Sequence, residues 1–225
     1  PEPPVPVPLL VRDGGASIPG GQQFGARWNH IGKAAELSLS FYEGYNHLPL
    51  IDPGLQSRRL ELYSNIRRFY PKMRMAGADA AIPLRWFAVK GEAAYFTSST
   101  PQADEYLLYV VQLERQQGEW HFVGGYAGEY VTEKRSLFDF APDRGLTRAF
   151  LGRAGYTIDA NRSVGLETAV RRDGNGVWTK LEYTQAFRQH WRITATVTWI
   201  RGEPEDFLGQ FHRNSHASLA VRYSF

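Results

Sequence analysis

Apolar and polar side chains alternate strictly along the last strand-length segment of the chain. In residues 215–225 the odd positions from Ala217 to Phe225 are apolar or aromatic, whereas the even positions include His216, Ser218 and Arg222. Successive side chains of a β-strand point to opposite faces. The segment therefore predicts a strand with one apolar and one polar face, each facing a different medium.

The same period of two recurs through most of the chain. The segments with a clear alternation are 34–42, 86–96, 105–115, 119–131, 147–158, 162–172 and 191–199. Three more segments show a weaker alternation: 22–30, 72–82 and 177–187. Trp191 and Trp199 lie at the two ends of one apolar face. Aromatic side chains occupy such positions at the two interfaces of a membrane. Together these segments predict roughly eleven strands.

The connections between these segments alternate in length. Short turns are expected at 32–33, 83–84, 116–118, 159–161 and 188–190, and longer loops at 43–71, 97–104, 132–146 and 201–214. Residues 173–176 read as a tight hairpin rather than part of a calcium loop, because Asn-Gly and Asp-Gly tolerate a positive φ. Short turns on one side and long loops on the other are typical of a transmembrane barrel.

Several classes of protein are excluded by composition. No run of about 18 apolar residues exists, which excludes a membrane-spanning helix. The chain has no cysteine, and its net charge of +3 comes from bases interspersed with acids, so we expect no disulfide framework and no nucleic-acid partner. Pro1 opens a segment that lacks the pattern of a signal peptide.

The closing strand resembles the C-terminal signal of Gram-negative outer-membrane β-barrel proteins. The residues that carry this resemblance are Leu219, Val221, Tyr223 and the terminal Phe225. The resemblance implies an all-β, transmembrane, antiparallel up-and-down β-barrel in the outer membrane, with a terminal aromatic read by the barrel-assembly machinery. Porin-like barrels fit better than siderophore-type receptors, whose strands and loops are longer.

Two regions are expected: an exposed Pro/Gly-rich segment at 1–20 and barrel strands at 21–225. Complete single-chain barrels have an even number of strands. Eleven strands therefore lead us to expect twelve or more in the complete barrel, with at least one upstream of the residues seen here. A soluble β-sandwich is the alternative fold, and it would require a second sheet to cover the apolar face.

The polar face of the barrel is the expected functional surface. Its charged residues, predicted to line a pore, are Glu36, Lys90, Glu92, Glu114, Glu129, Arg153, Glu167, Arg171, Lys180, Glu182, Arg192 and Arg222. Acids and bases balance in this set, which predicts a channel of weak ion selectivity for small polar solutes. The alternatives are charges that pair across strands in a closed lumen, a scaffold barrel that sheathes or docks a partner protein, or an outer-membrane hydrolase.

We expect no catalytic residue, no metal and no cofactor. His212 and His216, four apart on a loop entering a strand, lack a third ligand. For a hydrolase the candidates are His216 with Ser218, two apart on one face of a strand, and an Asp–His pair on outer loops drawn from Asp52, Asp206 and His212. No further sequence feature supports either candidate.

Three further expectations concern partners and packing. The pairs Arg58-Arg59 and Arg67-Arg68 could bind lipopolysaccharide phosphates, against ordinary solvated charge. Membrane lipid and a second copy of the chain are the other expected partners. Gly124, Gly125 and Gly128 are expected to relieve curvature and to leave room for neighbouring aromatic rings.

Overall fold

The computed structural model describes residues 9–58, 61–135, 146–173, 175–188 and 190–224. Its main feature is one antiparallel sheet of eleven strands. These strands are β2 (Phe24–Ile31), β3 (Glu36–Tyr45), β7 (Lys72–Pro83), β8 (Ala88–Thr97), β9 (Glu105–Gln117), β10 (Trp120–Glu133), β11 (Ala149–Asp159), β12 (Arg162–Arg171), β13 (Val177–Phe187), β14 (Trp191–Arg201) and β15 (His216–Tyr223). The all-β, antiparallel up-and-down fold expected from the alternation is confirmed.

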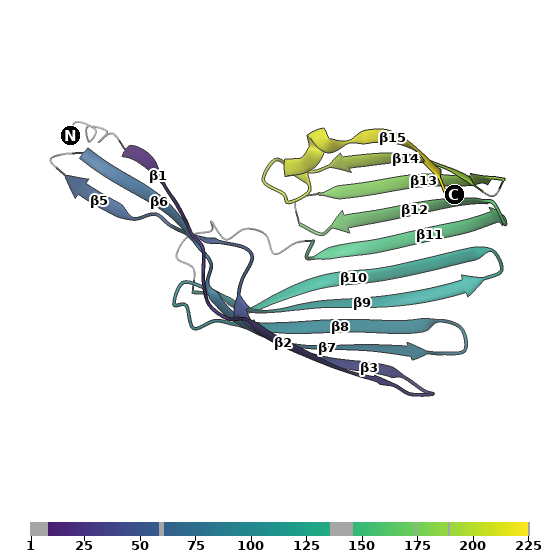
Figure 1. Ribbon diagram of the computed structural model, residues 1–225, viewed down its shortest axis with the longest axis horizontal. Coiled ribbons are helices and arrows are strands. Elements are labelled where there is room, and N and C mark those ends of the chain that lie inside the picture. The colour runs from purple at the N-terminus through teal and green to yellow at the C-terminus, as the bar shows by residue number, and fades with distance from the viewer. Residues whose placement is uncertain (1–8, 59–60, 136–145, 174, 189, 225) are drawn as a thin grey trace.

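Each strand of this sheet pairs with its neighbours in chain order, except where β3 pairs with β7 across an insertion. Figure 1 shows a curved sheet with its long loops at one end, the long-loop end, and its short turns at the other, the short-turn end. In the described residues, β2 and β15 each have a strand partner on one side only. The sheet is therefore open between these two edges.

A second, four-stranded sheet was not expected from the sequence. It consists of β1 (Leu9–Ser17), β4 (Leu50–Asp52), β5 (Leu55–Arg58) and β6 (Glu61–Phe69), with β1 parallel to β6. It replaces the long loop predicted at 43–71, and it also uses part of the segment predicted to be exposed at 1–20. Its strands lie at the long-loop end of the main sheet (Figure 1).

The cross-strand register explains why the alternation is so regular. Leu181 lies opposite Val197 and Ala195 opposite Leu219, so apolar positions of adjacent strands meet on one face of the sheet. No large side chain among the described residues is fully buried, and the few buried positions include small residues such as Ala149, at 0 % exposure. The described residues thus lack the covered apolar core that the sandwich alternative requires.

The helical content of the described residues is one 3₁₀ helix, η1 (Gly209–Asn214), between β14 and β15. Among the same residues, no helix has the length and apolar character needed to cross a bilayer. Secondary structure is therefore almost entirely strand, as the period of two predicts.

Candidate functional site

The register divides the main sheet into a polar face and an apolar face. Arg153, Glu167 and Lys180 are consecutive partners across β11, β12 and β13, and Glu114 connects to this row through Val123. Following the same parity through all eleven strands brings the twelve charged residues predicted from the sequence onto this one face. Their role in lining a pore stays a prediction.

The apolar face is formed by the opposite set of side chains, and it is exposed. Leu39 is 56 %, Val197 53 %, Leu219 70 % and Val221 56 % exposed. Aromatic rings lie on the same face, among them Trp28, Trp191 and Trp199. So large a continuous apolar surface is unfavourable in water and marks contact with an apolar medium or partner.

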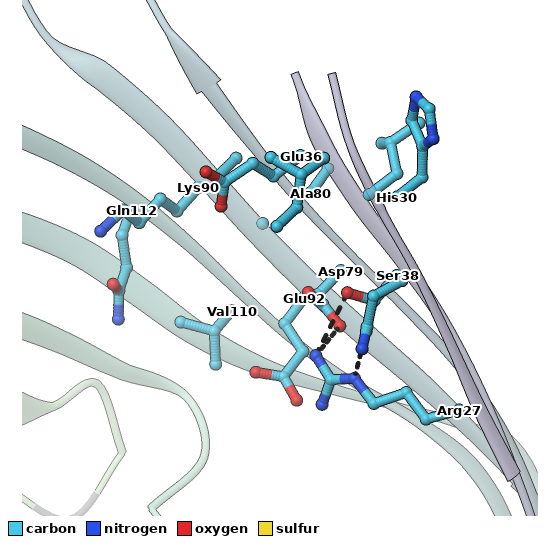
Figure 2. Close-up of a pocket in the computed structure, with 15 residues that line it drawn as sticks. Arg27, His30, Glu36, Ser38, Asp79, Ala80, Lys90, Glu92, Val110 and Gln112 are labelled. Carbon is cyan, nitrogen blue, oxygen red and sulfur yellow. Dashed lines mark hydrogen bonds and ion pairs between the residues drawn. The ribbon is translucent and has the colours of Figure 1, made fainter. Parts of the chain in front are cut away.

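A cavity of about 540 Å³ lies on the polar face between β2 and β9. Figure 2 shows charged side chains from β2, β3, β7 and β8 around it. Arg27 Nη2 lies 2.9 Å from Asp79 Oδ2 and donates to Ser38 Oγ at 3.2 Å. Glu36 and Glu92 line the same cavity and form no ion pair among the described side chains, so two free carboxylates face its interior.

Arg27 and Asp79 were not among the predicted site residues. Both lie on segments where the alternation is weak, since Ala76, Ala78 and Ala80 form the apolar face of β7. The signal that could have identified Arg27 is its position between Ala26 and Trp28, both apolar.

A row of ion pairs crosses the middle of the polar face. Glu114 binds both Lys90 and His121, with His121 Nε2 at 2.9 Å from its Oε1. Glu167 lies between Arg153 at 3.6 Å and Lys180 at 3.7 Å. These groups are partly exposed, so each pair contributes at most about 1 kcal/mol to stability. The row braces the sheet across neighbouring strands and keeps charge at its surface.

Charge is distributed unevenly across this face. From β2 to β9 it carries two cations and four carboxylates, the carboxylates being Glu36, Asp79, Glu92 and Glu114. From β12 to β15 the balance is reversed, with four cations, Arg171, Lys180, Arg192 and Arg222, and two carboxylates. The balance predicted from the sequence therefore conceals an acidic side and a basic side.

Arg192 and Arg222 form the most basic point of this face. They are directly opposite each other on β14 and β15, near the short-turn end. Neither forms an ion pair with any described carboxylate. Like charges facing each other across strands destabilise the pairing slightly, so this point favours a negatively charged neighbour.

A buried ion pair fixes the loop between β14 and β15. Arg171 Nε lies 2.8 Å from Asp206 Oδ1, an ion pair without the geometry of a hydrogen bond. The Arg171 side chain is 8 % exposed and the Asp206 side chain 1 %. Asp206 Oδ2 accepts a hydrogen bond from the Leu208 amide at 2.8 Å, and the Phe207 ring lies 5.8 Å from the guanidinium. Because Arg171 belongs to the polar face, this loop folds over the long-loop end of that face.

Each of the two candidate histidines of a hydrolase is held by a backbone carbonyl through Nδ1. His212 Nδ1 bonds the Gly209 carbonyl and His216 Nδ1 the Asn214 carbonyl, both at 2.8 Å. Asp206 is paired with Arg171, and Asp52 Oδ1 accepts from the Gly54 amide. No hydrogen bond or ion pair of the described residues joins His212 or His216 to Asp52, Asp206 or Ser218.

No group of three or more histidine, aspartate or glutamate side chains in the described residues could hold a metal ion. In the hairpin after β12, Asp173 pairs with Arg148 at 3.0 Å, and Asn175 has a positive φ of 52°. Gly174 lies outside the described residues. Asp173, Asn175 and Gly176 have the geometry of a turn.

Of the basic pairs predicted to bind lipopolysaccharide, Arg58, Arg67 and Arg68 belong to strands of the small sheet. Arg68 pairs with Asp13 at 3.0 Å. A hydrogen bond from the Gly15 amide, together with Arg68, holds the pKa of Asp13 below its ordinary value. Arg67 forms no described ion pair, and Arg59 lies outside the described residues.

The closing strand β15 carries the predicted assembly signal. Leu219, Val221 and Tyr223 share the apolar face and are 70 %, 56 % and 49 % exposed. Phe225 lies outside the described residues. The signal's recognition by the assembly machinery stays a prediction.

Comparisons with known proteins concern the fold. No protein-family model and no curated protein sequence matches the chain. Among solved structures, outer membrane phospholipase A from Escherichia coli and the Salmonella typhi outer membrane phospholipase dimer with bound calcium are similar. Each has 12 % sequence identity and a TM-score of 0.44 over 89 % of this chain and 76 % of the other.

This comparison corrects one expectation from the sequence. The chain was expected not to be an enzyme. The similar structures are those of an enzyme and contradict that expectation. At this identity and TM-score, however, the similarity concerns the arrangement of strands, and it assigns no activity, metal or oligomeric state to this chain.

Proposed function

We propose that this chain is an outer-membrane protein whose polar face lines an aqueous path for small hydrophilic solutes. The observation that carries the proposal is the sidedness of the sheet. All twelve predicted charges share one face, and large exposed apolar side chains occupy the other. A single layer of strands with these two faces suits lipid on one side and water on the other.

Strand length supports the same placement. The strands of the main sheet run from 8 residues in β2 to 14 in β10. About 9–11 residues suffice for a tilted strand to cross the apolar layer of a bilayer. The eleven strands of the main sheet, all within residues 21–225, would then form the membrane part of a barrel of twelve or more strands. The small sheet would lie outside the bilayer, at the long-loop end, within reach of lipopolysaccharide.

The uneven charge suggests which solutes pass. Free carboxylates at Glu36 and Glu92 lie on the acidic side, and Arg192 and Arg222 lie on the basic side. A solute with separated positive and negative groups would gain favourable contacts with both sides. Net charge over the twelve residues is zero, so preference between simple cations and anions should be weak.

Single-channel conductance tests the proposal. The protein would be refolded into a planar bilayer and recorded in several salts, then with a small zwitterion and a neutral sugar of similar size. Stepwise ohmic currents that the zwitterion blocks more strongly than the sugar would support it. The E36Q/E92Q variant should weaken the block, whereas E205A, an exposed loop control, should leave it unchanged.

The alternative, a scaffold barrel with a closed lumen, is favoured by the loop that Asp206 holds over the polar face. A folded, heat-modifiable protein that conducts nothing in any salt would overturn the channel proposal and support this alternative.

A further inference from the structure

Two arginines lie beside one tryptophan at the short-turn end of the sheet. Arg85 and Trp86 belong to the turn between β7 and β8, and Arg115 lies near the end of β9. The guanidinium carbon of Arg85 is 5.3 Å from the centre of the Trp86 ring, and that of Arg115 is 5.9 Å from it. The Trp86 indole is thus within cation–π distance of two guanidinium groups from separate parts of the chain.

This cluster lies on the apolar face. Arg115 is the register partner of Phe122, whose ring stacks on Trp120 at 5.4 Å, and Trp120 in turn contacts Tyr156 at 4.6 Å. Trp86 is 63 % exposed. The two guanidinium groups therefore border a belt of aromatic rings, the arrangement found where a membrane protein meets the headgroups of one leaflet.

Neither arginine is neutralised by the protein in its described part. Arg85 and Arg115 form no ion pair with a described carboxylate. The nearest acid in sequence, Glu114, points to the opposite face and is bound there by Lys90 and His121. By contrast, Arg74, on the apolar face at the long-loop end, is paired with Glu43 at 3.1 Å. The Arg85–Trp86–Arg115 cluster has charge available for a ligand.

We propose that the Arg85–Trp86–Arg115 cluster binds the phosphate of an anionic phospholipid in the leaflet at the short-turn end. Guanidinium groups match phosphate oxygens in charge and geometry, and the neighbouring rings would contact the glycerol backbone and upper acyl chains. The inference rests on the membrane placement in the proposed function, but it does not require an open channel.

Native mass spectrometry of the refolded protein in mixed micelles tests this site. Dioleoyl phosphatidylglycerol and dioleoyl phosphatidylcholine would compete at equal concentration for wild type, R85Q/R115Q and R201Q. Arg201 provides a matched control because it is an exposed arginine at the other end of the sheet. Each basic group near an anionic surface contributes about fivefold to binding, so the double variant should retain phosphatidylglycerol about 25-fold less well.

The outcomes separate this inference from the proposed function. Preferential retention of phosphatidylglycerol by wild type and R201Q, lost in R85Q/R115Q, would support the site. Equal retention by all three proteins, or displacement of phosphatidylglycerol by inorganic phosphate at the same concentration as the lipid, would overturn it while leaving the membrane placement intact. Failure of the wild type to float with lipid vesicles after refolding would overturn the membrane placement and the lipid site together.

Discussion

Replacement of Asp206 by alanine is expected to destabilise the protein strongly through the loop between β14 and β15. The side chain is 1 % exposed, and its carboxylate serves both Arg171 and the Leu208 amide. Its removal leaves a buried guanidinium, itself 8 % exposed, without its counter-charge. Removing one partner of a buried ion pair costs about 3–5 kcal/mol, because the remaining charge stays desolvated.

The free energy of unfolding would be measured by urea titration of the protein refolded into vesicles, followed by tryptophan fluorescence. E205A, at the exposed neighbouring position, should change it by less than about 0.5 kcal/mol. The double variant R171M/D206A removes both charges and should recover most of the loss, since an uncharged replacement of a buried pair is often near neutral.

This reasoning would be refuted by a D206A protein within about 1 kcal/mol of wild type, which would mean that water reaches Arg171. A double variant no more stable than D206A would also refute it, because the loss would then come from packing of the loop rather than from the unpaired charge.

Three further predictions concern other parts of the two sheets. Leu219→Arg should cost about 2–4 kcal/mol in a bilayer, whereas Ser218→Arg on the opposite face should cost much less, as judged by the same urea titration. Gly128→Ala should cost about 1–3 kcal/mol, because its Cβ would collide with the ring of Tyr109 on the neighbouring strand, and Gly124→Ala, with open space around it, should be close to neutral. The pKa of Asp13 is lowered in the folded chain. The contribution of Asp13 to the stability of the fold is therefore present above the ordinary carboxyl pKa and is lost as pH falls through the lowered value. Amide hydrogen exchange should therefore show β1 loosening at acidic pH in wild type, and the Asp13→Asn variant should lack this additional pH dependence.

The sequence by itself determined the eleven strands and the face on which each side chain lies. Both follow from a period of two, which is a local property: Trp191 and Trp199 share a face because an even number of residues separates them. Neighbouring strands then adopt the register that keeps their apolar positions together, since a slip of one residue would turn every side chain to the wrong face.

The tertiary structure alone decided which distant groups meet. The pairing of β1 with β6, the burial of Asp206 against Arg171 and the approach of Arg115 to Trp86 all join residues about 30 to 55 positions apart. Alternation carries no information about such contacts, because they depend on the paths of loops and on the stagger of strands across the sheet. For the same reason, the acidic and basic sides of the polar face became visible once the strands had been placed in order.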